Sequence, residues 1–96
     1  MTASFTHQAA VATNKPVSYM RQLCKQFGHR VEAEFEDASG YIRFGAGRCD
    51  LDAGDDHTLR LTITGNSEDE ASRLCQVVGS HLERFGRRDG LTLAWT

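Results

Sequence analysis

Several features that mark particular classes of protein are absent from this 96-residue sequence. The formal net charge is only -2, so no broad attraction to nucleic acid or to an anionic membrane is expected. No apolar run approaches the roughly 20 residues that a membrane-spanning helix needs. The first residues, MTASFTHQAA, lack a basic stretch followed by an apolar one, so they do not resemble a secretory signal. These absences predict a cytoplasmic protein that binds neither nucleic acid nor membrane.

Cysteine pairs and catalytic motifs are also missing. The three cysteines, Cys24, Cys49 and Cys75, are an odd number without paired spacing, which predicts free thiols in a reducing compartment. No serine or cysteine lies in a nucleophile elbow, and the chain shows neither a phosphate-binding loop nor a catalytic carboxylate pair. We therefore expect a protein that is not an enzyme in its own right, and the sequence requires no cofactor.

The clearest element that the sequence does contain is a helix within Asn66–Arg88. Ser67 and Glu70 have the spacing of a capping box, and Gly86 is a natural helix stop. His81 borders the apolar side, one turn from its neighbours in the stripe. Steps of three and four residues predict one apolar stripe, formed by Ala71, Leu74, Cys75, Val78, Leu82 and Phe85.

The N-terminal part of the chain predicts a strand followed by a second helix. Residues 4–12 alternate as a strand would, with Phe5, His7, Ala9 and Val11 on one face. Thr13 or Asn14 then offers a helix cap before Pro16, and Gly28 ends the helix. Its predicted buried stripe consists of Val17, Met20, Leu23, Cys24 and Phe27.

The middle of the chain predicts antiparallel strands. Residues 31–36 alternate apolar and acidic, and a turn at 37–40 places Glu34 opposite Arg43. One strand then continues through Leu51, with a bulge or a sharp bend at 45–47 where the inward parity changes. Pairing Leu51 with Leu59 leaves a loop at 54–56 and predicts a second ion pair, between Asp50 and Arg60. The remaining acidic residues are typical of a solvated sheet face.

A last short strand is expected at Leu91–Trp95, where Leu91, Leu93 and Trp95 alternate. The expected order is therefore β-α-β-β-β-α-β within a single domain of residues 1–96, whose first three residues are flexible. This order predicts an α+β two-layer sandwich, in which a largely antiparallel sheet carries two helices on one face. The two helices should run in roughly the same direction.

Three segments together resemble a bacterial family, domain-of-unknown-function family 2218: YMRQLCKQFGHRVEAEF, GRCDL and VVGSHLERFGRR. The acidic residue after the last arginines, Asp89, stands one place later than in the family. The resemblance implies a context and no reaction, since such domains often accompany siderophore-interacting flavin reductases and iron-uptake systems. The residues that match the family's motif are Leu23, Phe27, His29, Cys49, His81, Leu82, Arg84 and Phe85.

Basic residues at the two predicted helix exits form the first candidate site. If the exits are neighbours, a basic rim would receive an anionic partner such as a siderophore-interacting flavin reductase, or a small anionic ligand. The alternative is that these charges only complement the helix dipoles. We define the basic rim as Arg21, Lys25, Arg30, Arg84, Arg87 and Arg88.

A second candidate site depends on histidine. If the same two helix ends converge, His29 and His81 with Cys24 or Cys49 would offer ligands to a borderline metal or to haem iron. No Cys-x-x-Cys or His-x-x-x-His spacing supports that site. The competing interpretation is that each histidine hydrogen-bonds a helix end or a backbone carbonyl. The sequence does not give the oligomeric state.

Overall fold

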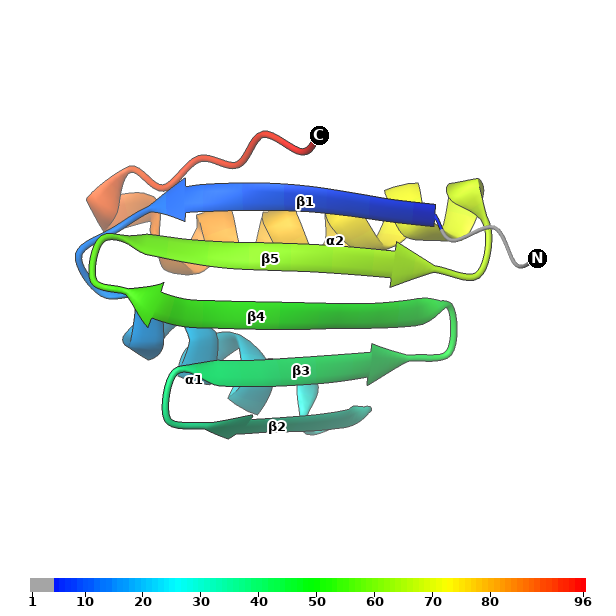
Figure 1. Ribbon diagram of the computed structural model, residues 1–96, viewed down its shortest axis with the longest axis horizontal. Helices are drawn as coiled ribbons and strands as arrows, with labels where there is room; N and C mark the ends of the chain where they lie inside the picture. The colour runs from blue at the N-terminus through cyan, green and yellow to red at the C-terminus, as the bar shows by residue number, and fades with distance from the viewer. Residues whose placement is uncertain (1–4) are drawn as a thin grey trace.

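The computed structural model describes residues 5–96, in which five strands and two helices form two layers (Figure 1). The expected flexibility of residues 1–3 and the expected strand start at residue 4 lie outside this range. Over the described part of the chain, no helix is both long and apolar enough to cross a membrane. The elements are β1 (Phe5–Ala12), α1 (Pro16–Phe27), β2 (Glu32–Glu36), β3 (Ser39–Phe44), β4 (Gly47–Asp55), β5 (Thr58–Gly65), α2 (Glu68–Phe85) and a 3-10 turn, η1 (Arg87–Asp89).

All neighbouring strands of the sheet are antiparallel, and their order is β1-β5-β4-β3-β2. Both helices lie behind the sheet in Figure 1, so one face of the sheet is covered and the other is open to solvent. The predicted α+β class, with an antiparallel sheet and two helices on one face, is confirmed. β2 forms one edge of the sheet and β1 the other.

The core lies between the sheet and the helices, and its residues come from the predicted stripes. Strand alternation supplies inward residues such as Leu51, Leu61 and Ile63, each at most 2% exposed. On α2, Leu82 is fully buried, whereas Phe85 is only half-buried. The predicted cap of α2 is confirmed, because the Ser67 hydroxyl accepts a 3.1 Å hydrogen bond from the Glu70 N–H.

Helix α1 starts slightly later than its expected cap residues. Lys15 is the N-cap, and its N–H donates a 3.0 Å hydrogen bond to the Thr13 hydroxyl. Pro16 occupies the first turn, where its missing N–H has no partner to lose. The helix ends as predicted at Gly28, whose N–H donates to the Cys24 carbonyl.

The single strand expected between residues 41 and 51 is two strands. Gly45 and Ala46 form a turn that reverses the chain, instead of a bulge or a bend within one strand, and Phe44 pairs with Gly47 across it. Gly47 has a φ of +154°, and a Cβ there would lie 2.2 Å from the Thr64 carbonyl oxygen, so only glycine fits. The additional reversal changes the direction of every element that follows.

The two helices are consequently antiparallel, and the expectation that they run the same way is wrong. Helix α1 returns across the sheet after β1, and α2 returns after β5, which is antiparallel to β1. The end of α2 therefore meets the start of α1. There the Tyr19 hydroxyl donates a hydrogen bond to Asp89, and Lys15 Nζ lies 3.8 Å from the same carboxylate.

The expected hairpin registers also differ. The turn after β2 contains only two residues, with Asp37 in the left-handed region at φ 54°, so Arg43 lies opposite Glu32 instead of Glu34. Arg43 Nη1 and Glu32 Oε1 are 3.8 Å apart. Aspartate tolerates that backbone conformation better than most residues.

The second expected ion pair changes for a similar reason. An irregularity between Asp52 and Asp55 lengthens β4, so Leu51 pairs with Leu61 and Arg60 lies opposite Asp52. Asp50 instead accepts a 2.8 Å hydrogen bond from Arg48 Nε of its own strand.

The last segment is not a strand, although its predicted alternation of burial is correct. Leu91 is buried, and Leu93 and Trp95 are half-buried. Two backbone hydrogen bonds join Gln8 and Thr96, so the segment runs beside β1 with limited pairing (Figure 1). Gly86 permits this course without a left-handed φ, because a Cβ there would lie 2.3 Å from Leu91 Cδ1.

Candidate functional site

The structure separates the basic rim into two groups. Asp89 lies against the first residues of α1, so Arg87 and Arg88 lie near the start of that helix. Lys25 and Arg30 lie at its other end, roughly 18 Å of helix away for a 12-residue α1. We call Arg21, Lys25 and Arg30 the α1 basic group, and Arg84, Arg87 and Arg88 the α2 basic group. All six side chains are exposed.

The two candidate histidines also lie in different surroundings. The His81 ring packs 4.7 Å from the Phe27 ring, and its Nδ1 lies 2.8 Å from the Val77 carbonyl oxygen. Because a carbonyl only accepts, Nδ1 carries the proton and Nε2 is left as the acceptor. His29 is exposed on the β2 side of α1, beside Ala33 and Phe35. The alternative interpretation, a bond to a backbone carbonyl, is thus confirmed for His81.

The proposed sulfur ligands do not complete a metal site. Cys49 is fully buried, and Cys24 is 2% exposed and directs its Sγ toward the Glu34 carbonyl. Burial raises the pKa of the Cys24 thiol to about 11 and raises the pKa of Cys49 further, so both stay protonated at neutral pH. Within residues 5–96, no three His, Cys, Asp or Glu side chains form a group that would hold a metal ion.

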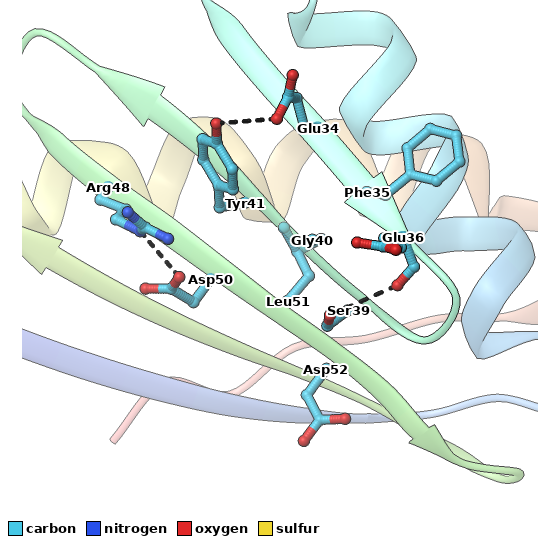
Figure 2. Close-up of a pocket in the computed structure, with 10 residues that line it drawn as sticks. All are labelled: Glu34, Phe35, Glu36, Ser39, Gly40, Tyr41, Arg48, Asp50, Leu51 and Asp52. Atoms are coloured by element: carbon cyan, nitrogen blue, oxygen red, sulfur yellow. Dashed lines mark hydrogen bonds and ion pairs between the residues drawn. The ribbon is translucent and has the colours of Figure 1, made fainter.

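The open face of the sheet carries a depression that is lined by Tyr41 and by other residues of β2, β3 and β4 (Figure 2). The Tyr41 hydroxyl donates to Glu32 at 2.5 Å and lies 3.3 Å from Glu34. These carboxylates, the Glu32 hydrogen bond first, raise the pKa of Tyr41 to about 12. The Arg48 guanidinium lies 4.5 Å above the Tyr41 ring and is held by Asp50.

The charge of this depression does not suit an anionic ligand. One guanidinium, Arg48, faces four carboxylates in its lining, those of Glu34, Glu36, Asp50 and Asp52. A carboxylate or phosphate ligand would therefore meet net repulsion. We place no anion site there, and the α1 basic group is the better surface for an anionic partner.

The α1 basic group lies beside β2, which forms one edge of the sheet. The Arg21 guanidinium lies 5.4 Å from the centre of the Phe35 ring, whose side chain turns toward α1 in Figure 2. Among the ion pairs within residues 5–96, none uses Arg21, Lys25 or Arg30. A shallow groove between α1 and β2 is lined by Cys24, Lys25, Gly28, His29, Ala33 and Phe35. We call this groove, the β2 edge and the α1 basic group the β2 margin.

Sequence reasoning missed Tyr41 and the groove for different reasons. A four-residue turn at 37–40 would place Glu36 opposite Tyr41, whereas the two-residue turn places Glu34 there. The signal that was available is Asp37, because aspartate favours a left-handed turn position more than most residues do. The groove had no signal in the sequence, because it depends on which strand becomes the sheet edge.

Three of the motif residues that suggested a family are in contact with one another. Phe27 of α1 packs on His81 of α2 at 4.7 Å, and His81 contacts Phe85 of its own helix at 6.3 Å, so the three rings form an aromatic row. Leu82 and Leu23 are fully buried beneath them. Residues 8–96 match the model of a family described as "Uncharacterized protein conserved in bacteria (DUF2218)". The chain belongs to this family.

A solved structure supports the DUF2218 fold. The NMR structure of PA4090 from Pseudomonas aeruginosa matches with a TM-score of 0.80 and 30% sequence identity. The match covers 96% of this chain and 95% of that one, so it includes both layers of the domain. No curated protein matches the chain. In this chain, Phe27 of α1 packs on His81 of α2, so this contact joins the two helices.

Proposed function

We propose that this protein is an accessory binding module of iron–siderophore use, which docks on a partner protein through the β2 margin. The observation that carries the proposal is an exposed cationic surface, Arg21, Lys25 and Arg30, free of internal ion pairs in the described chain and adjoining a sheet edge. Such a surface attracts an acidic partner and orients it. A cytoplasmic location belongs to the same proposal, supported by three buried free thiols.

The choice of partner rests on the family resemblance. Domains of this type often accompany siderophore-interacting flavin reductases, so such a reductase is the first partner to test. A ferric siderophore with free carboxylates is the corresponding small ligand. The depression around Tyr41 is disfavoured for that ligand by its carboxylates, so both occupants are assigned to the α1 basic group.

The experiment is a titration of the protein with a siderophore-interacting flavin reductase at two salt concentrations. We expect the affinity to fall steeply between about 20 mM and about 150 mM salt, because the Debye length shortens to about 8 Å. The variant Arg21→Glu/Lys25→Glu should bind at least about tenfold more weakly at the lower salt concentration. The fold should be unaffected, since both side chains are exposed.

The matched control is Arg87→Glu/Arg88→Glu, which changes the net charge by the same amount at the opposite end of α1. It should stay within about threefold of the wild-type affinity. Equal losses in the two double variants would show that only total charge matters and would contradict docking at the β2 margin. Equal affinities for every protein at both salt concentrations would reject an electrostatic docking surface altogether.

The alternative of metal or haem binding through His29 and His81 keeps one supporting observation. The Nδ1–H of His81 is engaged by Val77, so its Nε2 presents a lone pair from a half-buried ring. Absence of any binding to reductase or siderophore would favour this alternative. An absorption spectrum of the protein with added haem or ferrous iron, compared with that of His81→Ala, then tests it.

A further inference from the structure

We propose that the β2 edge receives an extended segment of the partner as an added strand, in which acidic and basic residues alternate. This inference rests on the proposed function, since it names the mode of docking at the same margin. Strand addition to an exposed edge takes affinity from main-chain hydrogen bonds and specificity from alternate side chains. The two requirements are a free backbone edge and a distinct environment on each side of it.

The backbone requirement follows from the two-residue turns. Turns of this kind close with a hydrogen-bonded pair, so Glu36–Ser39 and Phe44–Gly47 both bond across their strands. Hydrogen-bonded and non-hydrogen-bonded pairs then alternate along β2 and β3. Ala33 and Phe35 fall in the non-bonded class, and their N–H and C=O groups point out of the sheet edge.

The other edge of the sheet is less accessible. The Gln8 carbonyl of β1 accepts a 2.9 Å hydrogen bond from the Thr96 N–H, and the Gln8 N–H lies 3.4 Å from the Thr96 carbonyl oxygen. The C-terminal segment therefore already uses part of the β1 backbone. Within residues 5–96, no segment bonds to the outer backbone of β2 as Thr96 bonds to Gln8 of β1. The groove between α1 and β2 lies beside this edge.

The side-chain requirement is met because the two sides of β2 carry opposite charges. Glu32, Glu34 and Glu36 line the open-face side, and all three are exposed. Arg21 and Lys25 line the helix side. They are four residues apart, about 6 Å along the helix axis, which is close to the spacing of roughly 6.7 Å between same-face residues of a strand. An added strand with acidic residues toward α1 and basic residues toward the glutamates matches both rows.

A second copy of this chain is a poor occupant. Antiparallel pairing of two β2 strands would bring the glutamates of one copy opposite those of the other, and directly opposed like charges destabilise a sheet. A purely acidic strand would fit the α1 basic group and be repelled by the glutamates. The alternating pattern is the one that both faces of the edge accept.

The test uses a synthetic peptide with blocked ends, Lys-Val-Lys-Glu-Lys-Glu-Lys, whose two glutamates are adjacent on one face of a strand, and amide hydrogen exchange followed by NMR. Saturating peptide should slow exchange at the Ala33 and Phe35 amides by about tenfold or more, because these N–H groups gain partners. The amides of Glu34 and Glu36 should change little, since they already bond to β3. A peptide N-methylated on its strand-forming amides keeps the charges and should give no protection.

A protein variant provides the reverse control. Ala33→Pro removes an N–H that bonds to nothing within the sheet, so the fold should persist and peptide binding should be lost. Ala33→Val keeps the N–H and should bind like the wild type. If Ala33→Pro unfolds, its NMR spectrum will show it. The comparison of the peptide with its N-methylated form on the wild-type protein then decides by itself whether a strand adds to β2.

The outcomes separate this inference from the proposed function. If reductase binding depends on Arg21 and Lys25 but the Ala33 and Phe35 amides exchange unchanged with saturating peptide, strand addition is wrong and docking at the margin stands. If the reductase does not bind while the peptide protects both amides, the edge accepts strands and the chosen partner is wrong. Protection that rises with protein concentration alone would identify a second copy as the occupant and overturn the alternating-strand proposal.

Discussion

At the scale of single residues, Gly86 shows that the lack of a side chain can determine the path of the backbone. The residue ends α2, and its φ of -93° is open to any amino acid. What excludes other residues is contact, since a Cβ would lie 2.3 and 2.4 Å from two carbons of Leu91. The nearby left-handed position belongs to Gly90, at φ 67°. The sequence correctly predicts a stop at Gly86, but the reason for glycine there is the returning C-terminal segment.

We expect Gly86→Ala to destabilise the protein by about 1–3 kcal/mol, because Leu91 must leave its buried position or the helix end must shift. The measurement is the denaturant midpoint of unfolding, at equal slope. Gly45→Ala is the matched control, since a Cβ at Gly45 meets nothing within 4 Å. Equal midpoints for Gly86→Ala and wild type would mean that the C-terminal segment does not pack on the helix end.

At the scale of elements, local patterns predict each helix and strand well, and connections poorly. The stripes of α1 and α2, the Ser67 cap and the inward faces of the strands follow from side-chain periodicity, which needs no knowledge of neighbours. Whether Gly45 and Ala46 form a bulge or a turn depends on contact with β5, which the local sequence does not contain. That one difference inverts α2. It moves Arg87 and Arg88 away from Lys25 and Arg30, whereas His81 still packs on Phe27 at the end of α1.

The helix interface predicts different costs for two neighbouring positions of α2. Leu82→Ala should lower the free energy of unfolding by roughly 2–5 kcal/mol, because a fully buried side chain leaves a cavity. Phe85→Ala should cost less, since the ring is half-buried and its edge-on contact with His81 is at 6.3 Å. Denaturant unfolding of both variants tests the ranking. A larger loss at Phe85 would show that the aromatic row, and not the buried stripe, joins α2 to the core.

At the scale of the whole molecule, five groups with raised pKa values make stability sensitive to alkali. Burial raises the pKa of Cys24 from 9.0 to about 11 and acts in the same direction on Cys49 and Cys75. Hydrogen bonds to carboxylates raise the pKa values of Tyr19 and Tyr41. The folded state therefore holds these protons more tightly than the unfolded state. The resulting stability is complete below the unfolded pKa and is lost as pH rises through the folded pKa.

For Cys24, that window runs from pH 9.0 to about 11. We expect the free energy of unfolding to fall across it, measured by denaturant titration at several pH values. Cys24→Ala should have a shallower pH dependence over the same window, whatever its stability at neutral pH, because one linked proton is gone. A flat profile for the wild type would indicate that the thiols are accessible enough to ionise equally in both states.

The strand order also has a consequence for how the chain assembles during synthesis. β2, β3, β4 and β5 pair with their neighbours in sequence, so this meander closes through short loops as each strand is made. β1 is made first, but its register joins Phe5 to Gly65 and Ala12 to Thr58, so it has no strand to pair with until β5 is complete. Such distant pairings carry the larger loop-closure entropy and slow folding. The first strand to leave the ribosome is therefore expected to be the last to join the sheet.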